Sequence, residues 1–298
     1  MYANTQTQLF YCAAANERTY SLCSESPSGQ DGSNGYMGGA MKTCIAAALL
    51  LVCGICYSQA PPGDRPQNPA GYPESEAIAA WQGLGASYVR KALRDQTLDR
   101  DPVLNARVDR VMAAVGAAAA AIDPRFAKSS WKAILIADFG HGAVSFPGQT
   151  ILVDATFVRK LALTDDELAL IFCHEVAHVF AGHASEKLSF MAEFLGKEKL
   201  PTARTALLEF LTLDVYAAVF QPRANLQERD ADRIGAAILF ASGYDPQRAL
   251  ALFDKLEQLE AGAAGLGADV HDAAGVRKRL VAGVIAELER FHARPVPK

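Results

Sequence analysis

The chain has 298 residues, of which 50% are hydrophobic and 21% are charged, and its formal net charge at pH 7 is −4. These values are typical of one globular domain, or at most two, with enough chain to bury a sizeable core. The sequence has no basic block and no interleaved aromatic and basic residues, so we expect no nucleic-acid partner.

The N-terminal 60 residues differ in composition from the rest of the chain. Residues 1–40 are rich in Ser, Gly, Asn and Gln without periodicity, which predicts disorder. A positive start at Met41, a short apolar segment and small residues up to Ala60 then predict a signal peptide over residues 41–60. A membrane anchor is the alternative, but the apolar segment is short compared with the about 20 residues that a membrane span needs.

We therefore expect translation to start at Met41, with residues 1–40 being an extension assigned by mistake. The mature chain would be exported, with the bacterial periplasm as its compartment. Only Cys173 among the six cysteines lies beyond the leader, so the mature chain can form no internal disulfide, which suits an exported protein. We interpret Cys173 as a small core residue.

Helical patterns begin the remaining chain. Residues 61–74 are rich in Pro and Gly and predict a flexible lead-in to one folded domain over residues 75–298. Two amphipathic helices are predicted first, at 75–94 with Ser75 as the N-cap and at 101–122 with Asp101 as the N-cap.

In the next part of the chain, the hydrophobic pattern changes from helical to strand-like. Residues 131–137 and 150–153 are strand candidates, and the segment between them predicts a loop or a bulged edge. The edge of such a sheet, near Ala143 and Ser145, could hold an extended peptide by backbone hydrogen bonds. We expect His141, a lone histidine in the loop, to be exposed to solvent, with substrate contact as the alternative.

An H-E-x-x-H motif lies in an apolar run with helical periodicity. Thr164 and Glu167 form a capping box that predicts the start of this helix. His174 and His178 are four residues apart, so both imidazoles lie on one helix face and can bind one Zn²⁺ ion. Glu175 follows the first histidine directly, where a carboxylate can take a proton from an attacking water. The alternative is a surface helix that carries two histidines by chance.

A further histidine, His183, follows Gly182 at the end of this predicted helix. It lies five residues past His178 and therefore about 140° around the helix from the two ligand candidates. We expect it to interact with the helix dipole at the C-terminal end and not to be a third ligand.

Acidic residues on a later predicted helix, which runs to about Phe240, complete the candidate site. Glu228 and Asp232 are four residues apart and share a face. A catalytic zinc site needs a third protein ligand and an open position, so Glu228 is the candidate ligand. Asp232 can orient a ligand imidazole from behind. The alternative is an exposed charged face on which Arg229 and Arg233 pair with these acids.

Further helices are predicted at 186–196, 202–220, 245–259 and 276–291. The second of these is very apolar, but Arg204, Glu209 and Asp214 interrupt it. We interpret it as a core or groove helix and not as a membrane span.

These motifs and their order resemble one known family. Phe146-Pro147-Gly148 lies between the strand candidates, D-E-L-A precedes H-E-V-A-H, and E-x-x-A-D-R-x-G begins at Glu228. Over residues 75–290 the chain is similar to the zinc metalloproteases of the CAAX prenyl protease and HtpX-type heat-shock peptidase family. The resemblance is to the soluble exported subgroup, because no span is predicted after the leader.

The resemblance implies an α+β, mostly helical, zincin-like domain with a small β-sheet beside the H-E-x-x-H helix. It implies one Zn²⁺ per chain with His174, His178 and Glu228 as ligands. Glu175 would be the general base, and Asp232 would orient a ligand imidazole. We therefore expect an exported zinc metalloendopeptidase that cleaves polypeptides, in particular unfolded or misassembled envelope proteins. The alternative is a metal-containing binding or chaperone-like protein without turnover, although such a protein needs no base. The sequence does not indicate an oligomeric state.

The family's H-P-x-x-x-x-R element matches His271 to Arg277, with Asp272 in place of the proline. The resemblance implies that His271 lies on a loop that can approach the metal and gate the site. A histidine that merely packs at a helix start is the alternative. Arg277, Ala143 and Ser145 are further candidates for gating or substrate contact.

Overall fold

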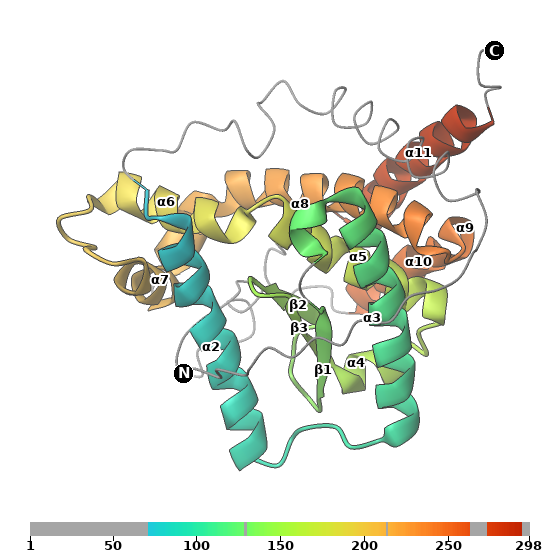
Figure 1. The fold of residues 1–298 in the computed structure, drawn as a ribbon, viewed down its shortest axis with the longest axis horizontal. Helices are drawn as coiled ribbons and strands as arrows, with labels where there is room; N and C mark the ends of the chain where they lie inside the picture. The colour runs from blue at the N-terminus through green and yellow to red at the C-terminus, as the bar shows by residue number, and fades with distance from the viewer. Residues whose placement is uncertain (1–70, 128–129, 213, 263–272, 294–298) are drawn as a thin grey trace, which may run out of the picture.

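The structure is a computed structural model that describes residues 71–127, 130–212, 214–262 and 273–293. The predicted extension and signal peptide, most of the lead-in, and His271 lie outside these residues. In the described part, long helices lie beside and above a small sheet (Figure 1), which confirms the predicted α+β, mostly helical, zincin-like class.

Two long helices come first in the described chain, α2 (Glu74–Arg94) and α3 (Pro102–Ile122). The Asp101 carboxylate accepts hydrogen bonds from the backbone N–H groups of the first turn of α3, as predicted. The prediction of Ser75 as the N-cap of α2 is wrong, because Pro73 occupies that position and no side chain caps the helix. Acidic residues in the first turn of α2 instead face the positive end of the helix dipole.

The sheet contains β1 (Lys132–Ile136), β2 (Ala143–Phe146) and β3 (Thr150–Asp154), in the order β1-β3-β2. β3 is parallel to β1 and antiparallel to β2, which leaves β2 at one edge. The sequence predicts a loop or a bulged edge at β2, but the structure has a regular strand. Val144 and Phe146 are buried there, and their packing keeps the strand in register with β3.

His141 is buried, with 7% of its surface exposed, so the expectation of a solvent-exposed residue is wrong. Asp154, at the end of β3, accepts a hydrogen bond from the Gly140 N–H at 2.7 Å, which folds the loop back on the sheet. The ring of His141 packs edge-on against Phe139. Burial lowers the pKa of His141.

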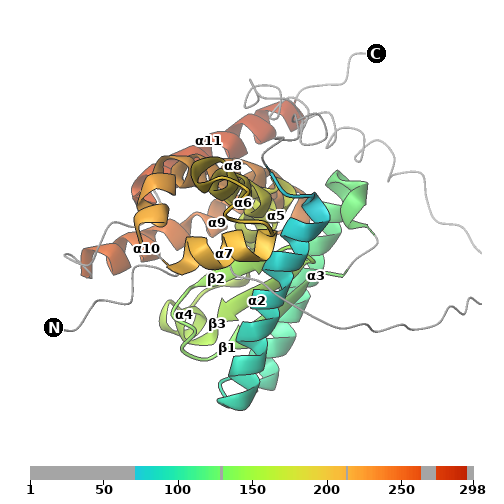
Figure 2. The same ribbon diagram turned by 90° about the vertical axis from the view of Figure 1, so that its left-hand side faces the viewer.

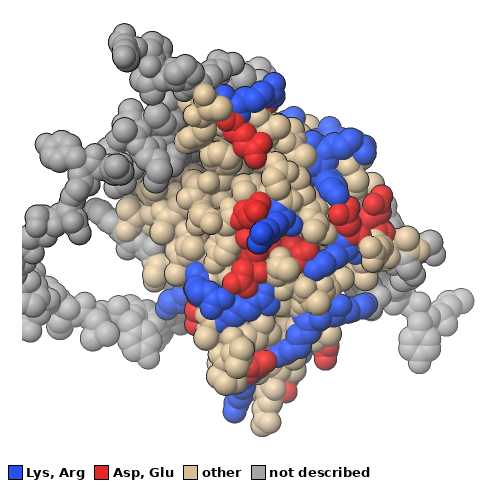
Figure 3. Space-filling model, turned by 90° about the vertical axis from the view of Figure 1, so that its right-hand side faces the viewer, with Lys and Arg blue, Asp and Glu red and all other residues tan. Residues whose placement is uncertain are grey.

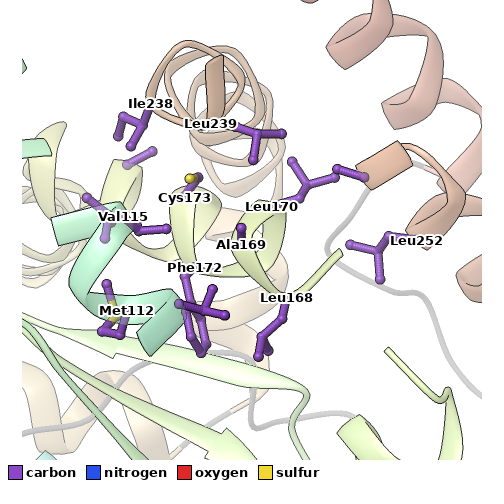
Figure 4. Packing of buried hydrophobic residues seen from close by; sticks show 14 of the residues in the cluster. Met112, Val115, Leu168, Ala169, Leu170, Phe172, Cys173, Ile238, Leu239 and Leu252 are labelled. Atoms are coloured by element: carbon purple, nitrogen blue, oxygen red, sulfur yellow. The ribbon is translucent and has the colours of Figure 1, made fainter. Parts of the chain in front are cut away.

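After the short helix α4 (Ala155–Lys160), the central helix α5 (Asp165–Phe180) begins with the predicted capping box of Thr164 and Glu167. α5 packs between α8 (Asp214–Ser242) and the sheet, as Figure 4 shows. Cys173 points from α5 towards α8, whereas Phe172 points the opposite way. Cys173 is fully buried, which confirms its interpretation as a core residue.

The region after α5 differs from the predicted helix boundaries. α6 (His183–Leu195) is followed by α7 (Ala203–Thr212), and these two helices lie beside α2 (Figure 2). The predicted helix at 202–220 corresponds to two elements, α7 up to Thr212 and α8 from Asp214, and residue 213 between them lies outside the described residues. α8 continues through Pro222. Burial of the neighbouring Phe220 and Ala224 stabilises α8 on both sides of the proline.

The C-terminal part contains α9 (Pro246–Ala249), α10 (Ala251–Gly262) and α11 (Ala274–His292). The predicted helix at 245–259 thus has a break at Leu250, while α11 matches the predicted last helix to within two residues. α11 packs against α8 and α10.

Among the described helices, none is both long enough and apolar enough to cross a bilayer. One face of the molecule carries Lys and Arg interspersed with Asp and Glu (Figure 3).

Candidate active site

Three predicted ligands come together where α5 meets α8. His174 and His178 lie on α5, and their Nε2 atoms are 3.1 Å apart. Glu228, on α8, places its Oε2 3.1 Å from Nε2 of His174 and its Oε1 3.4 Å from Nε2 of His178. One ligand atom from each residue lies within 4.8 Å of the other two. Two imidazoles and one carboxylate directed at one point are a donor set that fits Zn²⁺.

Gly235 allows this approach of α8 to α5. A Cβ atom at this position would lie 3.0 Å from both N and Cα of His174, which is closer than side chains normally approach a backbone. Ala231, one turn earlier, is also small and is fully buried. The spacing of the E-x-x-A-D-R-x-G motif therefore combines acidic residues for the site with small residues that bring the two helices together.

Substituting Gly235 by alanine should lower the stability of the protein by about 1–3 kcal/mol, because α5 and α8 would have to separate. The matched control is Gly283→Ala on α11, where an added Cβ meets nothing within 4 Å and helix propensity favours alanine. Thermal unfolding of both metal-free variants checks the prediction. Equal melting temperatures would show that the helix contact tolerates a methyl group.

The far side of the His174 ring is held by a buried ion pair. Nδ1 of His174 lies 3.0 Å from Oδ1 of Asp232, which is itself 3% exposed. Arg277, from α11, donates to both carboxylate oxygens, with Nε to Oδ2 at 2.9 Å and Nη2 to Oδ1 at 2.7 Å. Arg277 therefore lies on the side of the imidazole opposite Nε2, in contact with Asp232.

The pKa values follow from this arrangement. Burial alone would raise the pKa of Asp232, but Arg277 and His174 outweigh it and hold that pKa well below its ordinary value. Burial acts to lower the pKa of His174, but hydrogen bonds with Asp232 and Glu228 outweigh it and raise the pKa to about 9. A cation that binds Nε2 of His174 therefore has to displace a proton.

Glu175 turns towards the sheet edge. Its Oε2 accepts a hydrogen bond of 2.8 Å from the backbone N–H of Ser145 on β2. The predicted base is thus held between α5, which carries the two candidate histidine ligands, and the edge strand. Ser145 and Ala143, both predicted to contact substrate, are two residues apart on this strand, so their backbone groups are directed to the same edge. The N–H of Ser145 is already engaged by Glu175.

His183 contacts the site in a way that helix periodicity did not predict. Gly182 adopts a left-handed conformation with φ +72°, which ends α5 and makes His183 the first residue of α6. The imidazole thereby returns to the site, with its Nδ1 2.9 Å from Nδ1 of His178. The expected interaction with the C-terminal end of α5 assumed a continuous helix. The glycine before His183 is the sequence signal that the helix changes direction.

The fold and the cluster together define the class: a mostly helical, zincin-like domain with a His-His-Glu group beside the edge of a small sheet. The family model described as Peptidase family M48 matches residues 102–292. The chain therefore belongs to peptidase family M48.

Part of this chain is similar in sequence to proteins described as proteases. It is 27% identical over 158 residues to the mitochondrial metalloendopeptidase OMA1 of Arabidopsis thaliana, covering 51% of this chain and 31% of the relative. It is 26% identical over 188 residues to a putative beta-barrel assembly-enhancing protease of Vibrio cholerae, covering 58% and 37%. For OMA1 of Schizosaccharomyces pombe, identity is 27% over 135 residues, covering 44% and 39%. The chain thus spans about a third of the length of these relatives.

Proposed function

We propose that this protein is a zinc-dependent metalloendopeptidase that hydrolyses peptide bonds in polypeptides. The observation that carries the proposal is the position of the Glu175 carboxylate, on the same helix as the His174 and His178 imidazoles and at the edge of β2. Membership of a peptidase family supports the reaction class. The donor set of two imidazoles and one carboxylate supports one Zn²⁺ per chain with Glu228 as the third ligand.

The residues around the cluster have separate tasks in the proposed reaction. Zn²⁺, when bound, would polarise the scissile carbonyl and lower the pKa of the attacking water towards about 7. Glu175 takes a proton from that water as it adds to the carbonyl carbon. It then delivers the proton to the amine that leaves when the C–N bond breaks. Asp232, fixed by Arg277, keeps the Nε2 atom of His174 directed at the metal.

The substrate backbone has a docking edge in β2. Because β2 pairs only with β3 in the described sheet, its outer edge can accept an extended peptide as an added strand. Ala143 provides backbone groups directed to that edge, and Ser145 orients Glu175 from the same strand. A folded segment cannot pair in this way, so we propose that unfolded or misassembled chains are the substrates.

Metal removal tests the reaction class. Dialysis of the purified protein against a chelator should abolish cleavage of an unfolded protein substrate, and about one equivalent of Zn²⁺ should restore it. A Glu175→Gln preparation, purified and assayed in parallel, controls for contaminating proteases. Turnover that survives complete removal of metal would refute the proposal. Zinc binding without any turnover would favour a binding or chaperone-like protein.

We also propose that the mature chain is exported and acts in quality control of envelope proteins. The leader pattern over residues 41–60 supports export, and the similarity to a putative beta-barrel assembly-enhancing protease supports the envelope role. N-terminal sequencing of the protein from an exporting cell should begin at Pro61. A cytoplasmic protein that retains residues 1–60 would contradict export.

A further inference from the structure

The two histidines of the candidate metal cluster have different partners at their Nδ1 atoms. His174 contacts the carboxylate of Asp232 through Nδ1, whereas the Nδ1 atom of His178 faces the imidazole of His183 at 2.9 Å. The rings of His178 and His183 are edge-on, with their centroids 4.9 Å apart and an interplanar angle of 74°. His183 is 2% exposed, so no bulk water can take its place.

The position of the proton in this pair follows from the geometry. A nitrogen-to-nitrogen hydrogen bond needs one donor and one acceptor. The Nε2 atom of His178 faces Glu228 and His174, and it has to be unprotonated to bind a cation. The proton of a neutral His178 is then on Nδ1, so this atom donates and the Nδ1 of His183 accepts.

We propose that His183 is a positioning residue that acts through His178. Its unprotonated Nδ1 accepts the N–H of His178, which selects the tautomer of His178 with a free Nε2 and fixes the plane of the ring towards the metal. This inference rests on the proposed zinc site. It adds an imidazole partner for one ligand to the Asp232–Arg277 ion pair behind the other.

The surroundings hold His183 in place for this role. Gly182 sets the turn between α5 and α6, and its positive φ suits glycine. Gln227, the residue before the proposed ligand Glu228, donates its Nε2 to Oε2 of Glu186 at 2.8 Å and to the carbonyl of His183 at 3.4 Å. The start of α6 is thereby tied to the part of α8 that carries the third ligand.

Two substitutions separate the hydrogen bond from simple packing. His183→Leu fills most of the volume but offers no acceptor, whereas His183→Asn is smaller and keeps an acceptor oxygen near the position of Nδ1. Competition with a chromogenic chelator measures the zinc affinity of each full-length protein. We expect the leucine variant to bind zinc about 10–100-fold more weakly than wild type, and the asparagine variant to retain most of the affinity.

A packing role would give the opposite order, because leucine replaces buried volume better than asparagine does. Equal zinc affinity of the leucine variant and wild type, or equally weak binding by both variants, would overturn the inference. These results leave the proposed function standing, since wild type still binds zinc. A wild-type protein that binds no zinc would instead refute the proposed function, and the inference with it.

A measurement on the wild-type protein covers the case in which a variant does not fold. The chain has six histidines, so ¹⁵N-labelled imidazoles of the zinc-loaded protein can be assigned individually. Long-range ¹⁵N–¹H correlations should show His183 with its proton on Nε2 and His178 with its proton on Nδ1. A protonated Nδ1 on His183 in the zinc-loaded protein would overturn the inference.

Discussion

Glu175→Gln is expected to lower kcat by about 10²–10⁴-fold, the range in which general acid–base catalysis contributes, while zinc content stays at about one per chain. The amide has nearly the same shape as the carboxylate, and its oxygen can still accept the hydrogen bond from the Ser145 N–H. It cannot take the proton of the attacking water. The change therefore removes the proposed base and leaves the three candidate metal ligands in place.

Cleavage of an unfolded protein substrate, zinc content and thermal unfolding should be measured on the same preparation. Retained zinc and an unchanged melting temperature would assign the loss to the chemical step. Turnover within tenfold of wild type, in a preparation free of other proteases, would show that Glu175 is not the base.

Glu228→Ala should have the second large effect, because it removes the one carboxylate in the cluster of candidate ligands. Two imidazoles on a single helix are then left with one donor fewer than a catalytic zinc site uses. Loss of a residue that hydrogen-bonds a metal ligand typically lowers metal affinity about 10–100-fold. We expect loss of the ligand Glu228 itself to lower the zinc affinity further. Activity should fall with zinc occupancy.

Asp230→Ala is the matched control for Glu228→Ala. Asp230 lies two residues further along α8 and belongs to an ion pair with Arg233, outside the candidate metal cluster. Zinc affinity measured by chelator competition should be unchanged in this variant. If Glu228→Ala also kept full zinc affinity and activity, the third-ligand assignment would be wrong.

Local patterns predicted much of the fold. The capping box before α5 and the Asp101 N-cap of α3 are both present in the structure, because each depends on contacts within a few residues of the chain. β1 and β3 matched their predicted segments for the same reason, since alternation and β-branched residues are local signals. The break at Leu250 was missed, because an apolar run has the same periodicity whether or not the helix is interrupted.

The sequence by itself determined which residues share a helix face: His174 with His178 on one helix, and Glu228 with Asp232 on another. The need of a catalytic zinc site for a third protein ligand, together with the family resemblance, then predicted that these two faces meet. Only the tertiary structure decided the hydrogen bonds around these faces. Arg277 donates to Asp232, the Ser145 N–H donates to Glu175, and the imidazole of His183 contacts that of His178. The physical reason is that helix periodicity describes one element at a time. Contacts between elements depend on turns such as Gly182 and on close packing such as that at Gly235.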